Sequence, residues 1–291
     1  MPLINVKLIM KTFLFILLWS VSLLAYSQQV LDAAYLKCQY KFSYLKDTID
    51  HLKGRDDLLV LQIGKKSSKC YSYYTELCDS LERTSDGHEV WKEMFAKALE
   101  ELRQNKDREL FHRNVLGRRT TTRVYKNYPL GEMTITESIV ADCFIFRDKL
   151  EPQQWMMEDS TKVILGYNCQ KAVCDFRGRH YIAWFAPDVP EDNGPWKFFG
   201  LPGLIMEVYD KGRQYEYLIV SLQKVENEPI VFNEPVGDMR YRIITRTQFL
   251  KASIRHAEVS GKLMMSEMGF DIHNMDEKQL RYDCQERDYN K

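Results

Sequence analysis

Short segments in which polar and apolar residues alternate recur along most of the chain, and this pattern limits the fold more than any other feature. A period of two is typical of a β-strand that has one buried face. Single strands are predicted at 37–44, 57–64, 68–77, 120–129, 131–140, 142–150 and 161–169, and strand pairs at 170–187 and 204–225. Turn residues such as Pro129-Leu130-Gly131 separate neighbouring segments. The sequence therefore predicts long antiparallel meanders.

The segment 170–187, with the sequence QKAVCDFRGRHYIAWFAP, contains the clearest predicted hairpin. Its two-residue turn falls at Arg177-Gly178, because glycine readily adopts a positive φ. The cross-strand pairs that this turn predicts are Asp175–His180, Cys174–Tyr181 and Val173–Ile182. We interpret the Asp–His pair as a surface contact rather than a catalytic dyad. Apolar residues on both faces indicate a central hairpin that is covered on both sides.

Two segments have helical spacing instead. After Asp86 and Glu89, apolar residues recur on one helical stripe, at Trp91, Met94, Phe95, Ala98, Leu99 and Leu102. We expect Trp91 and Phe95 to be core anchors. A second helix is predicted over 245–269, with Gly269 as C-cap and its methionines as core packing rather than Cu(I) ligands. The fold class predicted is α+β: one domain over residues 28–291, with a large curved antiparallel sheet, two or more helices, and a charged tail from His273 that frays apart from Cys284.

The first 27 residues have the features of a secretory signal peptide. Lys7 and Lys11 precede the apolar run 12–24, and small residues follow at Ala25 and Ser27. The run is shorter than the about 20 apolar residues that span a bilayer. We expect cleavage after Ser27, no lipid anchor, and a mature chain that is soluble in the periplasm or secreted, without a transmembrane segment.

The composition and the missing motifs disfavour several function classes. Lysine plus arginine and aspartate plus glutamate balance at 41 each, so no nucleic-acid partner is expected. The sequence shows no Gly-x-Ser-x-Gly elbow, no phosphate-binding glycine loop and no paired-histidine metal motif. We therefore expect neither a metal nor another cofactor, and an enzyme is the less favoured interpretation.

Seven cysteines remain in the mature chain, and an oxidising compartment would pair most of them. The preferred prediction bridges Cys169 to Cys174 and Cys70 to Cys78, each through a local bend. If 169–174 is one straight strand, its cysteines lie about 16 Å apart and must pair with neighbouring strands instead. A thioredoxin-like centre is excluded because no Cys-x-x-Cys occurs.

Residues 194–205, GPWKFFGLPGLI, carry a density of apolar side chains that fits neither strand nor helix. Prolines interrupt the sheet from Pro187 onward, so residues 187–200 are predicted to be a loop that leaves the sheet and returns. Leu201-Pro202-Gly203-Leu204 fits a type II turn, with positive φ at glycine. We expect Trp196 and Phe198 to fold back onto the sheet near Trp184. Two roles remain open: a plug at one end of the sheet, or a binding site.

The hexapeptide GLPGLI at 200–205, with Arg177-Gly178-Arg179 and the Gly-Pro-Trp-Lys-Phe segment before it, resembles the GLPGLI family of exported bacterial proteins. The looser similarity extends over most of the mature chain, including YPLGEMTITESI and ILGYNCQ. The family's biochemical role is not established. The resemblance implies an envelope protein of Gram-negative bacteria, often encoded beside TonB-dependent outer-membrane receptors, and a sheet similar to lipoprotein-carrier half-barrels.

Three functions follow as hypotheses. The first is a non-enzymatic binding or chaperone-like protein of the periplasm for an apolar small molecule or peptide, and the second is an interaction partner of a TonB-dependent receptor. The third is a metal- or thiol-dependent hydrolase, with a cavity lined by Asp175, His180, Asp188 or Glu191. The predicted binding residues are Trp184, Pro195, Trp196, Phe198, Phe199, Gly200, Leu201, Pro202, Gly203 and Leu204.

Overall fold

The structure is a computed structural model. It describes residues 28–45, 54, 56–107, 111, 115–267 and 284–288. The predicted signal peptide and the predicted C-cap Gly269 lie outside these residues. In the described part of the chain, no helix combines the length and the apolar character that a membrane crossing requires.

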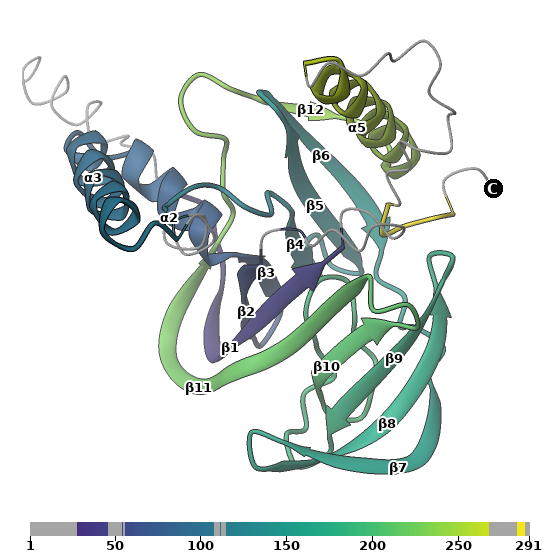
Figure 1. The fold of residues 1–291 in the computed structure, drawn as a ribbon. Helices are drawn as coiled ribbons and strands as arrows, with labels where there is room; N and C mark the ends of the chain where they lie inside the picture. The colour runs from purple at the N-terminus through teal and green to yellow at the C-terminus, as the bar shows by residue number, and fades with distance from the viewer. Residues whose placement is uncertain are drawn as a thin grey trace, which may run out of the picture.

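One open sheet of twelve strands dominates the molecule (Figure 1). Its strands are β1 (Val30–Tyr44), β2 (Asp57–Gly64), β3 (Ser68–Ser72), β4 (Arg123–Lys126), β5 (Glu132–Ile139), β6 (Asp142–Lys149), β7 (Met156–Ile164), β8 (Tyr167–Phe176), β9 (Arg179–Ala186), β10 (Leu204–Asp210), β11 (Tyr215–Val231) and β12 (Tyr241–Ile243). Their order is β12-β6-β5-β4-β3-β2-β1-β11-β10-β9-β8-β7. Neighbours pair antiparallel except β12 and β6, which pair parallel. The predicted α+β class with a large sheet is confirmed.

Three helices accompany the sheet in the described residues: α2 (Tyr73–Glu82), α3 (Gly87–Asn105) and α5 (Arg246–Glu267). The sequence pattern assigned 68–77 to a strand, but β3 ends at Ser72 and α2 follows directly. The reason is local, because the Ser72 side chain accepts a hydrogen bond from the Thr75 amide and so caps α2. α5 lies against β6, where Phe249 stacks on Phe146 at 5.2 Å (Figure 1).

The helix α3 has the predicted position but not the predicted burial. Trp91 is 36% exposed and Met94 40% exposed. Trp91 stacks on Phe95, its neighbour one turn along the same helix, at 5.1 Å. The prediction that Trp91 is a core anchor was therefore wrong. An apolar stripe defines which face of a helix is apolar, but it does not supply the surface that would cover it.

The hairpin of β8 and β9 has the predicted register. Asp175 pairs with His180 across the strands, and the turn residues Arg177 and Gly178 both have positive φ, at 52° and 78°. The hairpin is not central, since only β7 lies beyond β8. Alternation predicts one strand over 161–169, but a further turn at Leu165–Gly166 divides this segment between β7 and β8.

The core forms on one face of the sheet. A row of paired residues crosses seven strands on this face, and six of its seven members are buried; the row is Leu222, Cys38, Leu61, Cys70, Val124, Ile135 and Phe146. The helix α5 covers this face at the β6 end. The loop between β9 and β10 covers it nearer the middle, where the Trp196 amide donates to the Cys70 sulfur at 3.3 Å.

All seven cysteines are buried, and none is bridged. Cys169 and Cys174 lie in the continuous strand β8, so the bend that a local bridge requires is missing. Cys70 is in β3 and Cys78 is in α2. Cys38 and Cys70 share one face, but the intervening strand β2 separates them by two strand spacings, about 9.5 Å. The structure thus differs from the predicted local bridges, and the cysteines act in it as small core residues.

Candidate functional site

The loop between β9 and β10 (residues 187–203) is held in place by its own backbone. Asn193 and Phe199 form an isolated antiparallel bridge within the loop. The amides of Leu204 and Ile205 donate to the carbonyls of Val189 and Asn193, at 2.9 and 3.0 Å. The loop is therefore an ordered layer on the core face, as expected for a segment whose prolines stop the sheet.

The aromatic side chains of this loop point inward. Phe198 is fully buried and Trp196 is 8% exposed. The ring of Phe198 meets the rings of Tyr181, Trp196 and Tyr217 at centroid distances of 4.7, 5.2 and 6.0 Å. These edge-on contacts are the arrangement that aromatic quadrupoles favour. The predicted fold-back onto the sheet is confirmed for both residues.

Trp184 does not take part in this cluster. Residues alternate along β9, so Trp184 lies on the face opposite Tyr181. There it is half-buried, and the Lys162 ammonium sits 4.4 Å from its ring centroid. The expected contact between Trp184 and Trp196 was therefore wrong in its choice of face. Among the ten predicted binding residues, only Gly200 and Pro202 are exposed.

Gly203, near the end of the loop, has a different role from the one that the type II turn predicts. Gly203 does not have the positive φ that a type II turn requires, whereas Gly200 does, at 90°. A Cβ atom on Gly203 would lie 2.3 Å from the carbonyl oxygen of Ala186. Gly203 is thus needed for the close approach of two backbones, and Gly200 for a positive φ that other residues rarely adopt.

A buried lysine from β4 fastens the loop to the sheet. The Lys126 ammonium donates to the side-chain oxygen of Asn193 at 2.9 Å and to the carbonyls of Gly194 and Phe198 at 2.8 and 2.7 Å. All three acceptors are neutral. Burial lowers the pKa of Lys126 to about 7. The loop is therefore held by polar as well as aromatic contacts.

Charged residues of the same segment face the other way, toward the C-terminus of the chain. Lys197 is 1% exposed, and its ammonium lies 2.5 Å from a carboxylate oxygen of Glu286 and 3.3 Å from one of Asp148. Arg179 pairs with Asp210 at 3.1 Å. The sequence does not predict this cluster, because its charged residues lie far apart along the chain. The available signal was a lysine and two arginines inside a segment otherwise rich in apolar residues.

A polar cleft of about 330 Å³ lies beside this cluster. Asp148, Arg177 and Asp288 line its charged side, and Pro152, Gln153 and Phe176 line another part. Gln153 also anchors the loop, since its oxygen accepts from the Phe199 amide at 2.9 Å. The cleft is thus a boundary between the ordered loop and the C-terminal segment.

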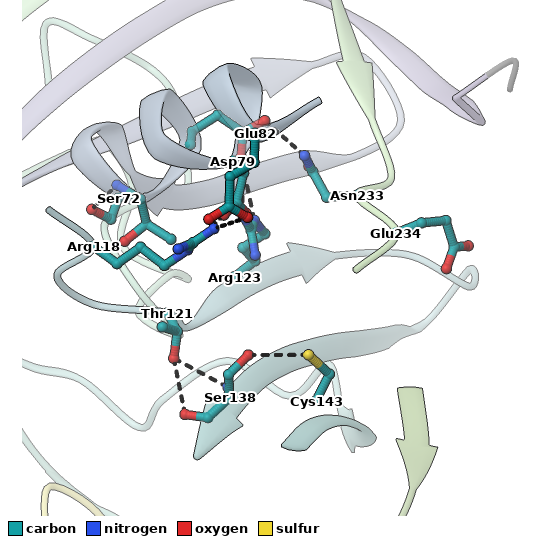
Figure 2. A network of polar contacts seen from close by, with 12 residues as sticks. Ser72, Asp79, Glu82, Arg118, Thr121, Arg123, Ser138, Cys143, Asn233 and Glu234 are labelled. Carbon is teal, nitrogen blue, oxygen red and sulfur yellow. Dashed lines mark hydrogen bonds and ion pairs between the residues drawn. The ribbon is translucent and has the colours of Figure 1, made fainter. Parts of the chain in front are cut away.

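A second polar network attaches α2 to the sheet, and Figure 2 shows it from close by. The Arg118 guanidinium bridges Asp79 and Glu82 at 2.8 and 2.6 Å, and Arg123 also pairs with Asp79. Asn233, just after β11, donates to Glu76 at 2.7 Å. Each of these ions has an opposite charge beside it, which is the arrangement of a structural anchor.

Within the part of the chain that the structure describes, β8 is the strand that pairs with β7, so β7 is one open edge of the sheet (Figure 1). Its apolar side chains are largely in solvent: Met156 is 62% exposed, Met157 54% and Val163 65%. A bulge between Glu158 and Thr161 interrupts the pairing with β8. An edge strand presents unpaired backbone donors and acceptors along its outer side.

The titratable groups named for a hydrolase include buried thiols and an exposed Asp–His pair. Burial raises the pKa of the Cys38 and Cys174 thiols to about 12 and of Cys70 to about 11, so few thiolates form near neutral pH. The Asp175–His180 pair spans 2.9 Å on an exposed surface. Among the described residues, no three His, Cys, Asp or Glu side chains converge on a possible metal position.

Residues 177–207 match the family described as "Protein of unknown function (Porph_ging)", which is the GLPGLI-type family. The resemblance inferred from the motif is confirmed for this segment. No curated protein matches the chain. Two solved structures of PNGF-II, in the P21 and C2 space groups, are similar to it at 12% identity, with TM-scores of 0.47 and 0.46. Each similarity covers 77% of this chain and 34% of the other, so the chain spans about a third of those proteins, and no functional conclusion follows.

Proposed function

We propose that this protein, whose residues 177–207 carry the GLPGLI-type signature, is a non-enzymatic periplasmic binding protein for extended apolar peptide segments. The binding surface that we assign is the β7 edge. The observation that carries the proposal is an open edge strand with exposed apolar side chains, at one end of a large ordered sheet. A peptide that adds a strand to such an edge gains backbone hydrogen bonds and side-chain contacts together.

The inward-facing loop favours this site over the aromatic segment. The side chains of Trp196 and Phe198 already contact each other and the sheet, so they offer no surface to a ligand. The ring of Phe198 ties the loop to Tyr181 of β9 and to Tyr217 of β11. A rigid sheet loses little entropy when a strand is added, which strengthens binding.

The β7 edge also carries features that limit indiscriminate pairing. Glu158, Asp159 and Lys162 place charges along it, and the bulge divides it into two short stretches. Natural edge strands use both devices against aggregation. We therefore expect reversible binding of short segments with apolar side chains rather than continued growth of a sheet.

The experiment uses a labelled extended peptide, Lys-Val-Thr-Val-Thr-Val-Lys, titrated with the mature chain and followed by fluorescence anisotropy. We expect saturable binding that Val163→Lys weakens at least about tenfold, because a charge replaces an apolar contact at the edge. A peptide with proline at its central position should not bind, since proline cannot donate to the ladder.

Val220→Lys is the matched control. Val220 is 44% exposed, but it lies on β11, which has β1 and β10 on its two sides. This variant should bind the peptide as the wild type does. Equal binding by the Val163→Lys and wild-type chains would contradict the assignment of β7.

A second candidate function, contact with a TonB-dependent outer-membrane receptor, is favoured by one observation. Val90, Trp91 and Met94 form an exposed apolar group on α3, far in the structure from β7 (Figure 1). A rigid tryptophan is a good interface anchor. Loss of receptor co-purification with Trp91→Ala, but not with Val163→Lys, would support this function over the first.

Both functions require export. We expect N-terminal sequencing of the mature protein from the periplasmic fraction to begin at Gln28. A mature chain that retains Met1 or Met10 would contradict the proposed localisation.

A further inference from the structure

The C-terminal segment Cys284–Asp288 lies in a site that the GLPGLI-type segment builds. Arg179 donates to the carbonyls of Cys284 and Gln285, at 2.9 Å each, and the Arg287 amide donates to the carbonyl of Arg177 at 2.8 Å. A Cβ atom on Gly178 would lie 2.9 Å from the Cβ of Arg287. The β8–β9 turn therefore holds the backbone of an extended peptide, and its glycine leaves room for it.

Two carboxylates of the C-terminal segment complete the contact. Glu286 is 5% exposed, and its two oxygens lie 2.5 Å from the Lys197 ammonium and 2.5 Å from the Arg246 guanidinium. Asp288 accepts two hydrogen bonds from Arg246, at 2.8 and 2.9 Å, and one from Arg177 at 3.2 Å. A two-pronged arginine–carboxylate contact of this kind is specific as well as strong. The two acidic residues stand two positions apart in the sequence.

Cations outnumber carboxylates among the described residues that the rest of the chain supplies to this site. The cations are Arg177, Arg179, Lys197 and Arg246. The carboxylates that the sheet itself pairs with them are Asp148 and Asp210. Glu286 and Asp288 of the segment add two further carboxylates that pair with these cations, and Arg287 adds one more positive charge. One further carboxyl lies nearby, on Glu137, and burial raises its pKa to about 7.

We propose that Arg177, Arg179, Lys197 and Arg246 form a recognition site for an acidic peptide segment with two carboxylates two positions apart. The chain's own residues Cys284–Asp288 occupy this site in the structure. This segment has the same acidic character as the partner peptide that the site would bind. It therefore competes with that peptide for the site. This site is distinct from the β7 edge, and it recognises charge rather than apolar side chains.

The test titrates a labelled peptide with the sequence of residues 284–291, in which serine replaces the cysteine. The acceptor is a mature chain that ends at Asp283. We expect saturable binding, at least about tenfold tighter than that of a peptide with Gln and Asn in place of the two acids, because charge-assisted hydrogen bonds are lost. The full-length chain should bind the acidic peptide at least about tenfold more weakly, since its site is occupied. Added salt should weaken binding.

Arg246→Gln in the shortened chain should abolish the preference for the acidic peptide. Arg242→Gln is the matched control, because Arg242 pairs with Asp142 on the exposed β12–β6 surface instead. If the shortened chain does not fold, the full-length Glu286→Gln/Asp288→Asn variant replaces it in the same titration. Equal binding of the acidic and neutral peptides, or no saturable binding to a folded acceptor, would overturn the proposal. Failure of both acceptors to fold would also overturn it, since the segment would then be an integral part of the core.

Discussion

The loop at 194–205 and the strand β7 both contain several apolar residues, but these side chains are buried in the loop and exposed on β7. Phe198 and Leu201 in the loop are 0% and 1% exposed, whereas Met156 and Val163 in β7 are 62% and 65% exposed. The irregular segment is core, and the regular strand is surface. A high density of apolar residues therefore indicates a segment that can be buried. Whether its side chains are in fact covered depends on where the segment lies in the sheet.

The largest expected effect comes from truncation of the loop's central ring. Phe198→Ala should lower the free energy of unfolding by about 3–5 kcal/mol, because a fully buried ring leaves a cavity among Tyr181, Trp196 and Tyr217. Urea denaturation measures the change. The matched control Met157→Ala on β7 should stay within about 0.5 kcal/mol of the wild type. Similar losses for both variants would remove the distinction between the two regions.

A smaller effect is expected where the loop rejoins the sheet. Gly203→Ala should cost about 1–3 kcal/mol, since the new Cβ would meet the Ala186 carbonyl and force the backbones apart. Gly212→Ala, in the turn after β10, is the control. Its φ is not positive and its nearest neighbour would be 3.5 Å away, so denaturation should show no loss of stability.

The polar fastening of the loop should give stability a dependence on pH. Burial holds the pKa of Lys126 at about 7, below the ordinary 10.5, so between these values the unfolded state binds the proton and the folded state does not. Stability contributed through this group therefore rises as pH increases from 7 toward 10.5, by up to about 1.4 kcal/mol per pH unit. Lys126→Met removes this slope.

The comparison is made by denaturation of the wild type and the Lys126→Met variant at several pH values. Lys69, whose pKa burial lowers to about 8, remains in both chains and cancels in the difference. A difference that stays constant from pH 6 to 9 would show that Lys126 does not titrate in this window.

The smallest effect on stability is expected on the β7 edge. Val163→Lys should leave the free energy of unfolding within about 0.5 kcal/mol, because the side chain is already in solvent. Loss of peptide binding without loss of stability is the signature of a surface site. A large destabilisation would instead mean that Val163 is part of the core.

The regular elements could be predicted from the sequence because their signals are local. The β8–β9 register follows from one glycine turn, and the bounds of β2 follow from one alternating run. The predictions that were wrong depend on which other part of the chain packs against an element. The apolar stripe on α3 predicts which face is apolar but not how exposed it is. Alternation continues from β3 into α2, and only the Ser72 cap marks where the helix begins.

The site could be predicted only in part for the same reason. The inward fold of Trp196 and Phe198 follows from their chemistry, since large rings leave water wherever a core is near. The contact of Lys197 with Glu286 joins residues 89 positions apart, and no local pattern indicates such a pair. The open position of β7 depends on the order of all twelve strands, which alternation alone does not determine.

Hydrogen exchange of the mature chain, with and without the Lys-Val-Thr-Val-Thr-Val-Lys peptide, tests the central claim most directly. We predict that amides in β7 (Met156–Ile164) gain protection when the peptide binds, because added backbone hydrogen bonds slow their exchange. Amides at 195–204 should be unchanged by the peptide, since that loop is already packed on the core. New protection at 195–204 with none in β7 would contradict the account, because the loop would then be the binding site and the edge strand would not.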